Sequence, residues 1–146
     1  MTDQAGSEFD AYAADYQQVL QQGLKLTGED SSYFAEGRIR HTAQCLRKLS
    51  VEVRSVLDFG CGTGTAAEHL LAHFPAARVC GIDVSAASIE QARQIHQDER
   101  VCFFTPSALP ADIRFDLAYC NGVFHHIPPV QRADALRQIY DLLNPG

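Results

Sequence analysis

A glycine-rich turn follows a short apolar run in the middle of the chain, and it constrains the fold more than any other feature. The segment reads VLDFGCGTG over residues 56–64. Glycines at alternate positions let a backbone turn tightly and approach a ligand without Cβ clashes. Their spacing differs from the dinucleotide fingerprint G-x-G-x-x-G, and no G-K-[ST] follows as in a Walker phosphate loop. The sequence therefore predicts a ligand-binding turn that does not hold a pyrophosphate.

Short apolar runs alternate with helix-like segments from residue 55 onward. The runs are SVLDFG, ARVCGID, VCFF and FDLAYC. This alternation is typical of a parallel sheet covered by helices on both faces, an α/β fold. We count four strands. Ligands bind outside the carboxyl ends of such strands, so the segments that follow the runs should share one site.

The first 50 residues have a different pattern. Apolar residues recur at helical spacing over residues 9–22 and over about residues 33–49. We therefore predict an N-terminal helical cap segment over residues 1–50 and an α/β core over residues 51–146.

Composition limits the partners and the compartment. The 146 residues carry a net charge of −6 without a basic patch, so sequence-independent nucleic-acid binding is not expected. No apolar run approaches the roughly 18 residues of a membrane span, and the N-terminus does not resemble a signal peptide. The five cysteines lack C-x-x-C or other metal-ligand spacing, so we expect reduced thiols, no metal site and a cytoplasmic location.

Four motifs in order make the chain similar to the class I S-adenosylmethionine-dependent methyltransferases of the small-molecule type. They are VLDFGCGTG at 56–64, GIDVS at 81–85, DLAYCNGVFHHIP at 116–128 and LNPG at 143–146. The resemblance covers residues 55–146 well and the N-terminal helices loosely. It implies a Rossmann-like core, with the four strands in the order 3-2-1-4, that binds S-adenosylmethionine and transfers its methyl group to a small-molecule acceptor.

The resemblance also implies that this core is partial. The family core has seven strands, so a four-stranded chain would lack the later ones and would leave the fourth strand with an uncovered edge beside Phe115, Leu117 and Tyr119. An uncovered edge invites self-association. Two interpretations stay open: a methyltransferase, or a non-catalytic S-adenosylmethionine-binding or interaction module built on the same core.

The strongest expected cofactor contacts follow the first two strands. S-adenosylmethionine has a sulfonium and an ammonium and no phosphate, which suits a loop without lysine beside two carboxylates. By resemblance, Asp58 faces the ammonium and Asp83 holds the ribose hydroxyls. The residues expected to make room for the cofactor are Gly60, Cys61, Gly62 and Gly64.

Weaker contacts are expected around the adenine and the methionine. Val84 would pack on the adenine, and Ser107 or Thr105 would replace the acid that the family often has after the third strand. Asn121 and Gly122 would lie beside the methionine part of the cofactor, although a role as a helix cap explains these two residues equally well.

Four further residues complete the expected site. Tyr16 would fold over the sulfonium and Arg38 would meet the cofactor carboxylate, with a core and a solvated role as the alternatives. His125 and His126 are candidate general bases at the substrate mouth. On a helix, adjacent histidines point about 100° apart and cannot act as a pair. Simple packing is the alternative for them.

Overall fold

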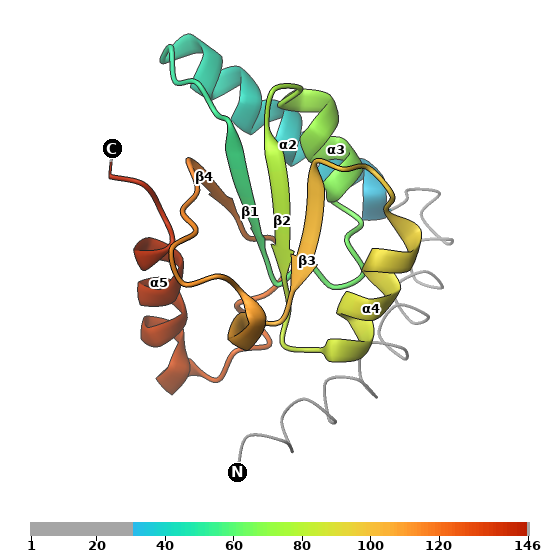
Figure 1. Ribbon diagram of the computed structural model, residues 1–146. Helices are drawn as coiled ribbons and strands as arrows, with labels where there is room; N and C mark the ends of the chain where they lie inside the picture. The colour runs from blue at the N-terminus through green and yellow to red at the C-terminus, as the bar shows by residue number, and fades with distance from the viewer. Residues whose placement is uncertain (1–30, 146) are drawn as a thin grey trace.

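Strands and helices alternate along the chain as the sequence pattern predicts (Figure 1). The computed structural model describes residues 31–145. The helices and strands are α2 (Ser31–Lys48), β1 (Ser55–Phe59), α3 (Ala67–His73), β2 (Arg78–Ile82), α4 (Ala86–Ile95), β3 (Val101–Phe104), β4 (Leu117–Tyr119) and α5 (Arg132–Asp141). Two short 3-10 turns, Pro106–Ala108 and Pro129–Gln131, follow β3 and precede α5.

The four strands form one parallel sheet in the order β3-β2-β1-β4, which confirms the expected topology. In register, Asp58 of β1 lies beside Gly81 of β2 on one side and Tyr119 of β4 on the other. Because the strands are parallel, their carboxyl ends meet at one edge of the sheet. The glycine turn and the segments after β2, β3 and β4 therefore lie along that edge.

Alternate residues of each strand face opposite cores. Val56 and Val79 pack with Ile39 and Ala43 of α2 and with Leu70 of α3. A second core, on the opposite face, contains buried Leu57, Phe59, Cys80 and Ile82, against which Ala135, Ile139 and Leu142 of the α5 region pack. Helices therefore cover both faces, as expected.

Helix α4 begins where a capping residue predicts it. The side chain of Ser85 accepts a hydrogen bond of 3.1 Å from the backbone N–H of Ser88, which satisfies a free donor of the first turn. Ile89 and Ala92 are buried on its inner face. His96 continues that face, with its ring centre 5.4 Å from that of Phe103.

The expected apolar stripe of α5 is wrong in part. The sequence predicts that Ala133, Leu136, Ile139, Tyr140 and Leu143 pack inward. In the structure Leu136 and Tyr140 are 57% and 76% exposed, whereas Ala135 and Leu142 join Ile139 and Leu143 against the core. The face of α5 that packs on the core is therefore shifted toward Ala135 and Leu142 relative to the prediction.

The edge of β4 is covered at its beginning, contrary to expectation. Phe115 is buried at 2% exposure. Its N–H donates 2.9 Å to the carbonyl of Leu142, and its carbonyl accepts 2.8 Å from the N–H of Asn144. The segment after α5 thus pairs with the residue that leads into β4. Leu117 and Tyr119 are half-buried, and among the described residues β4 has no strand neighbour except β1.

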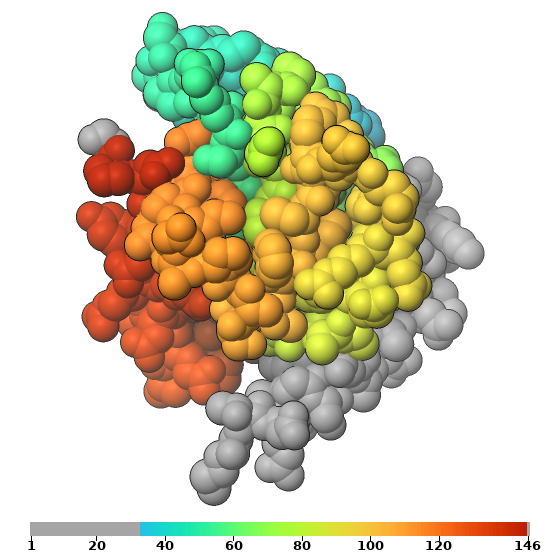
Figure 2. Space-filling model, in the orientation of Figure 1, coloured from blue at the N-terminus to red at the C-terminus, as the bar shows by residue number. Residues whose placement is uncertain are grey.

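The surface beyond β3 is built by one irregular segment. Figure 2 shows residues 105–115, in orange, between α4 in yellow and α5 in red. Within residues 31–145, no helix is both long enough and apolar enough to cross a membrane.

Candidate cofactor site

The glycine turn ties the end of β1 to the end of β2. The N–H groups of Gly60 and Cys61 both donate to the carbonyl of Ile82, at 2.8 and 3.0 Å. The N–H of Gly64 then donates 2.9 Å back to the carbonyl of Cys61. These bonds fix the backbone of the turn before any ligand is present.

The three glycines of the turn have different neighbours. A Cβ at Gly60 would collide with the side chain of Val123, and a Cβ at Gly64 would lie 2.6 Å from Cζ of Phe103. Gly62, with φ +54°, has no described atom within 4 Å of the place where a Cβ would be. Gly60 and Gly64 therefore allow close packing within the protein, whereas Gly62 faces open space that a ligand can use.

Asp83 binds the glycine turn directly. Its Oδ2 accepts a hydrogen bond of 2.8 Å from the N–H of Gly62, and its Oδ1 accepts 2.9 Å from the N–H of Ser85. A carboxylate offers about four lone-pair positions, so each oxygen keeps room for one more donor. The side chain is half-buried at the end of β2, where a ligand can reach it.

Asp58 is the buried carboxyl of the site, with 4% exposure. Burial, and to a smaller extent the negative charge of Asp83, raise the pKa of Asp58 to about 7. No described side chain or backbone group donates a hydrogen bond to its carboxyl oxygens. The adjacent Cys61 is buried, and burial raises the pKa of its thiol, so it is a small neutral wall of the site.

The structure brings Arg38 and Asn121 together although 83 positions separate them. Nη1 of Arg38, in α2, donates a hydrogen bond of 2.6 Å to Oδ1 of Asn121, in the segment after β4. Gly122 follows with φ +73° and has open space beside its Cα. No helix begins here, so the alternative that these residues cap a helix is wrong.

Tyr119 is a member of the site that the sequence analysis did not single out. Its hydroxyl is buried and has no hydrogen-bond partner among the described residues. It lies beside Asp58 in the strand register. The sequence did contain a signal for this residue. Side chains alternate between the two faces along FDLAYC, and a fourth strand next to the first places Tyr119 on the same face as Asp58.

The expected adenine contacts lie on the surface. Val84 is 58% exposed directly after Asp83. Ser107 is exposed in the 3-10 turn after β3, where its hydroxyl lies 3.3 Å from that of Thr105. Both hydroxyls remain available to a ligand beyond β3. Tyr16 lies outside the described residues.

The two histidine rings lie against each other with a tilt of 43° between their planes, which corrects the expectation that they sit on a helix and point apart. His125 and His126 lie in a turn closed by a 2.9 Å bond from the N–H of His126 to the carbonyl of Val123. Their ring centres are 3.8 Å apart. Burial, and next the neighbouring His125, lower the pKa of His126, so that ring is neutral at pH 7 and can accept a proton.

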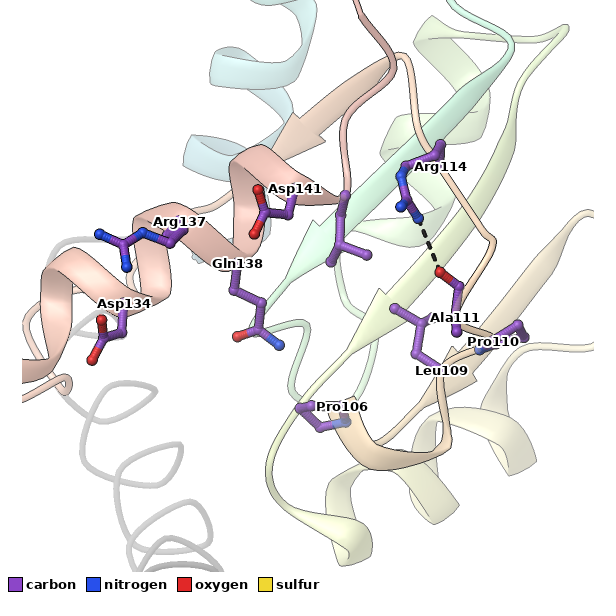
Figure 3. A pocket seen from close by; sticks show the side chains of 10 residues that line it. Pro106, Leu109, Pro110, Ala111, Arg114, Asp134, Arg137, Gln138 and Asp141 are labelled. Atoms are coloured by element: carbon purple, nitrogen blue, oxygen red, sulfur yellow. Dashed lines mark hydrogen bonds between the residues drawn. The ribbon is translucent and has the colours of Figure 1, made fainter.

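A separate pocket of about 450 Å³ lies between α5 and residues 106–114 (Figure 3). Arg114 faces into it but donates to the carbonyl of Ala111 in its own loop. The pocket contains none of the expected cofactor residues. Within residues 31–145, no group of three or more His, Cys, Asp or Glu side chains could hold a metal ion.

Comparison with known proteins identifies a family. Residues 57–146 match a family model described as a methyltransferase domain. Trans-aconitate 2-methyltransferases from Methylobacterium radiotolerans and Escherichia coli are 34% and 33% identical in alignments of 121 residues, which cover 77% of this chain. The chain spans 43–44% of the length of these curated relatives.

Solved structures agree in fold. An S-adenosylmethionine-bound amino pentose methyltransferase from Micromonospora echinaspora superposes with a TM-score of 0.69 at 20% identity, over 88% of this chain and 52% of the other. A TehB-like S-adenosylmethionine-dependent methyltransferase from Corynebacterium glutamicum gives a TM-score of 0.62 at 23% identity, over 92% and 68%.

Proposed function

This chain belongs to the methyltransferase domain family, and from that membership we propose that it binds S-adenosylmethionine and transfers the methyl group to a small organic molecule. The observation that carries the proposal is the pair of carboxyls at the ends of β1 and β2: Asp83 binds the N–H of Gly62 beside open space, and its charge helps to raise the pKa of the buried Asp58. One carboxyl is buried and lacks a donor, and the other has lone pairs to spare. A ligand with an ammonium and paired hydroxyls would satisfy both.

Charge supports this ligand over a pyrophosphate. A phosphate site needs a lysine or converging backbone N–H donors. Here the N–H groups of Gly60, Cys61 and Gly62 are already used by Ile82 and Asp83. The residues that fit the cofactor are therefore Asp58 for the ammonium, Arg38 with Asn121 for the carboxylate, and Asp83 for the ribose hydroxyls, with Val84 and Ser107 at the adenine.

When bound, the cofactor supplies an electrophilic methyl carbon on a sulfonium. Held by Asp58, Asp83 and Arg38, it would give this methyl group to the acceptor, and the electron pair of the broken carbon–sulfur bond would stay on sulfur. The protein's part is to align the reactants and exclude water. The buried side chain of Cys61 and the half-buried side chain of Val123 suit that task. We assign the neutral ring of His126, which lies against the tilted ring of His125, to take the acceptor's proton where the acceptor carries one.

The test separates binding from turnover. The chain is incubated with S-adenosylmethionine and small organic acids, starting with trans-aconitate, because two relatives are named for it. We expect S-adenosylhomocysteine to form only when an acceptor is present. Binding without turnover across the acceptors would instead support the non-catalytic module. An absence of cofactor binding would overturn both.

We propose that a second copy of this chain covers the free edge of β4. Phe115 directs its N–H and carbonyl to this edge, where they bond Leu142 and Asn144. Strand residues two apart point the same way, so Leu117 and Tyr119 present further backbone groups there. Edges of this kind pair with other chains. Size-exclusion chromatography over a range of concentrations should show a dimer, and a monomer throughout would contradict the proposal.

We make two further proposals, one on the division of the chain into segments and one on its cellular location. We propose that residues 1–50 act as a helical cap segment and residues 51–146 as the cofactor-binding core; α2 supports this through Arg38, which reaches over the sheet edge to Asn121. We also propose a cytoplasmic location. The free state of all the described cysteines, Cys45 exposed among them, suits a reducing compartment.

A further inference from the structure

The hydroxyl of Tyr119 is a buried polar atom that the fold leaves without a partner. No described residue accepts or donates a hydrogen bond at this atom. Leaving such a group unsatisfied destabilises a folded chain, whereas a phenylalanine of the same shape avoids that loss. A tyrosine at this place therefore reduces stability unless its hydroxyl is used in another state of the molecule.

The neighbours of Tyr119 indicate what that use is. Asp58 is its register partner on β1, and side chains of paired parallel residues lie on the same face. The ring also packs against the core that contains Ile39 of α2, one residue from Arg38. Asn121, two residues further along, holds the Arg38 guanidinium at 2.6 Å. Burial, and next the charge of Asp58, raise the pKa of the Tyr119 hydroxyl, whereas the charge of Arg38 lowers it, so both charged groups lie close enough to act on this hydroxyl.

These two charges match an α-amino-acid group. A zwitterion with its ammonium toward Asp58 and its carboxylate toward Arg38 would pass the region where the Tyr119 hydroxyl lies. The adenosine end of the same ligand would lie at Asp83, at the end of β2. Tyr119 therefore lies nearer to the place expected for the methionine end of the cofactor than to the place expected for its nucleoside.

We propose that the Tyr119 hydroxyl is a positioning group that hydrogen-bonds the α-amino-acid end of S-adenosylmethionine, between Asp58 and Arg38. This inference rests on the proposed function and adds a specificity residue to it. A phenol in this position discriminates ligands that carry the amino-acid group from those that end at the thioether.

The test compares Tyr119→Phe with the unsubstituted chain by calorimetry, using S-adenosylhomocysteine and 5′-methylthioadenosine, which lacks the amino-acid group. We expect S-adenosylhomocysteine to bind the variant about tenfold more weakly, and methylthioadenosine to bind both proteins alike. Urea unfolding of the ligand-free variant should have a midpoint equal to or higher than that of the unsubstituted chain. Tyr140→Phe is the matched control, because Tyr140 is 76% exposed on α5, and it should change neither affinity.

Each other outcome has a definite meaning. Unchanged affinity of Tyr119→Phe for S-adenosylhomocysteine overturns the inference and leaves the proposed function intact. Equal losses for both ligands, together with a lower urea midpoint, assign Tyr119 a structural role and also overturn it. Failure of the unsubstituted chain to bind S-adenosylhomocysteine overturns the proposed function itself.

Discussion

The backbone N–H of Gly62 donates a 2.8 Å hydrogen bond to Oδ2 of Asp83, 21 positions further along the chain. The carboxylate assigned to the ribose is therefore also the anchor that shapes the glycine turn. This one bond stabilises the turn and also orients the carboxylate for the ligand, so substitutions of Gly62 and of Asp83 should affect both stability and binding.

Replacement of Asp83 should affect stability and binding together. Asp83→Ala leaves the N–H groups of Gly62 and Ser85 without their acceptor, so the free energy of unfolding should fall by about 1–3 kcal/mol. Its affinity for S-adenosylhomocysteine should fall by a similar free energy, through the lost ribose contacts. Asp83→Asn keeps one acceptor oxygen and should lose less of both. Urea unfolding and calorimetry measure the two effects. Full affinity in a folded Asp83→Ala chain would contradict the ribose assignment.

Two glycine substitutions should separate folding from binding. Gly62 and Gly64 both have positive φ, +54° and +81°, so alanine strains each backbone similarly. At Gly64 the added methyl would also lie 2.6 Å from Phe103, whereas at Gly62 it projects into open space. We expect Gly64→Ala to lose more stability in urea. Gly62→Ala should stay folded and bind S-adenosylhomocysteine more than about tenfold more weakly, by steric overlap with the ligand. Equal binding by Gly62→Ala and the unsubstituted chain would show that no ligand uses that space.

The pH dependence of stability should reveal Asp58. Its pKa rises from an ordinary 3.8 to about 7 on folding, so the folded state holds a proton that the unfolded state releases. The contribution of Asp58 to stability is therefore complete below about pH 4 and is lost as the pH rises through 7. The slope is at most about 1.4 kcal/mol per pH unit. Urea midpoints from pH 4 to pH 8 should fall less steeply for Asp58→Asn than for the unsubstituted chain; parallel curves would contradict the prediction.

The affinity for S-adenosylhomocysteine should have the opposite pH dependence and should rise with pH. An ammonium beside Asp58 favours the ionised carboxyl, so S-adenosylhomocysteine should bind more tightly at pH 8 than at pH 6 and should release a proton near pH 7. Calorimetry in buffers of different ionisation enthalpy measures the proton count. Affinity that does not change with pH would place the ammonium elsewhere.

Asp116 should stabilise the opposite end of the sheet. Its carboxylate accepts bonds from the N–H groups of Arg54 and Ser55 and, through Oδ1, from Nδ2 of Asn144 at 2.8 Å. These bonds outweigh the opposing effect of burial and lower the pKa of Asp116. Asp116→Ala should lower the free energy of unfolding by about 1–2 kcal/mol and leave cofactor affinity unchanged. Asp112→Ala, at an exposed residue nearby, is the control and should have no effect.

Local patterns were enough to predict much of the fold. Four apolar runs and the cap at Ser85 predict the strands and the start of α4, because each depends on neighbouring residues. The order of the strands is a long-range property and followed from the family resemblance. The inner face of α5 was predicted only in part: Ile139 and Leu143 face the core as expected, whereas Leu136 and Tyr140, which are also apolar and at helical spacing, are exposed.

Contacts across long sequence separations explain the rest of the site. Asp58, Asp83 and the glycines follow from strand ends and were identified from the sequence. The bond from Arg38 to Asn121 and the orphan hydroxyl of Tyr119 depend on how α2 and β4 pack around β1. The contact between His125 and His126 depends on a turn. The residue pattern of this turn resembles that of a helix, so the sequence could not distinguish the two.

The most direct measurement is calorimetric titration of the unsubstituted chain with S-adenosylhomocysteine and, separately, with NAD. The two share an adenosine, but only the first lacks a pyrophosphate and carries an ammonium. We predict saturable one-to-one binding of S-adenosylhomocysteine and no heat from NAD. Binding of NAD, or heat from neither ligand, would contradict the assignment of the glycine turn and its two carboxyls to a sulfonium nucleoside.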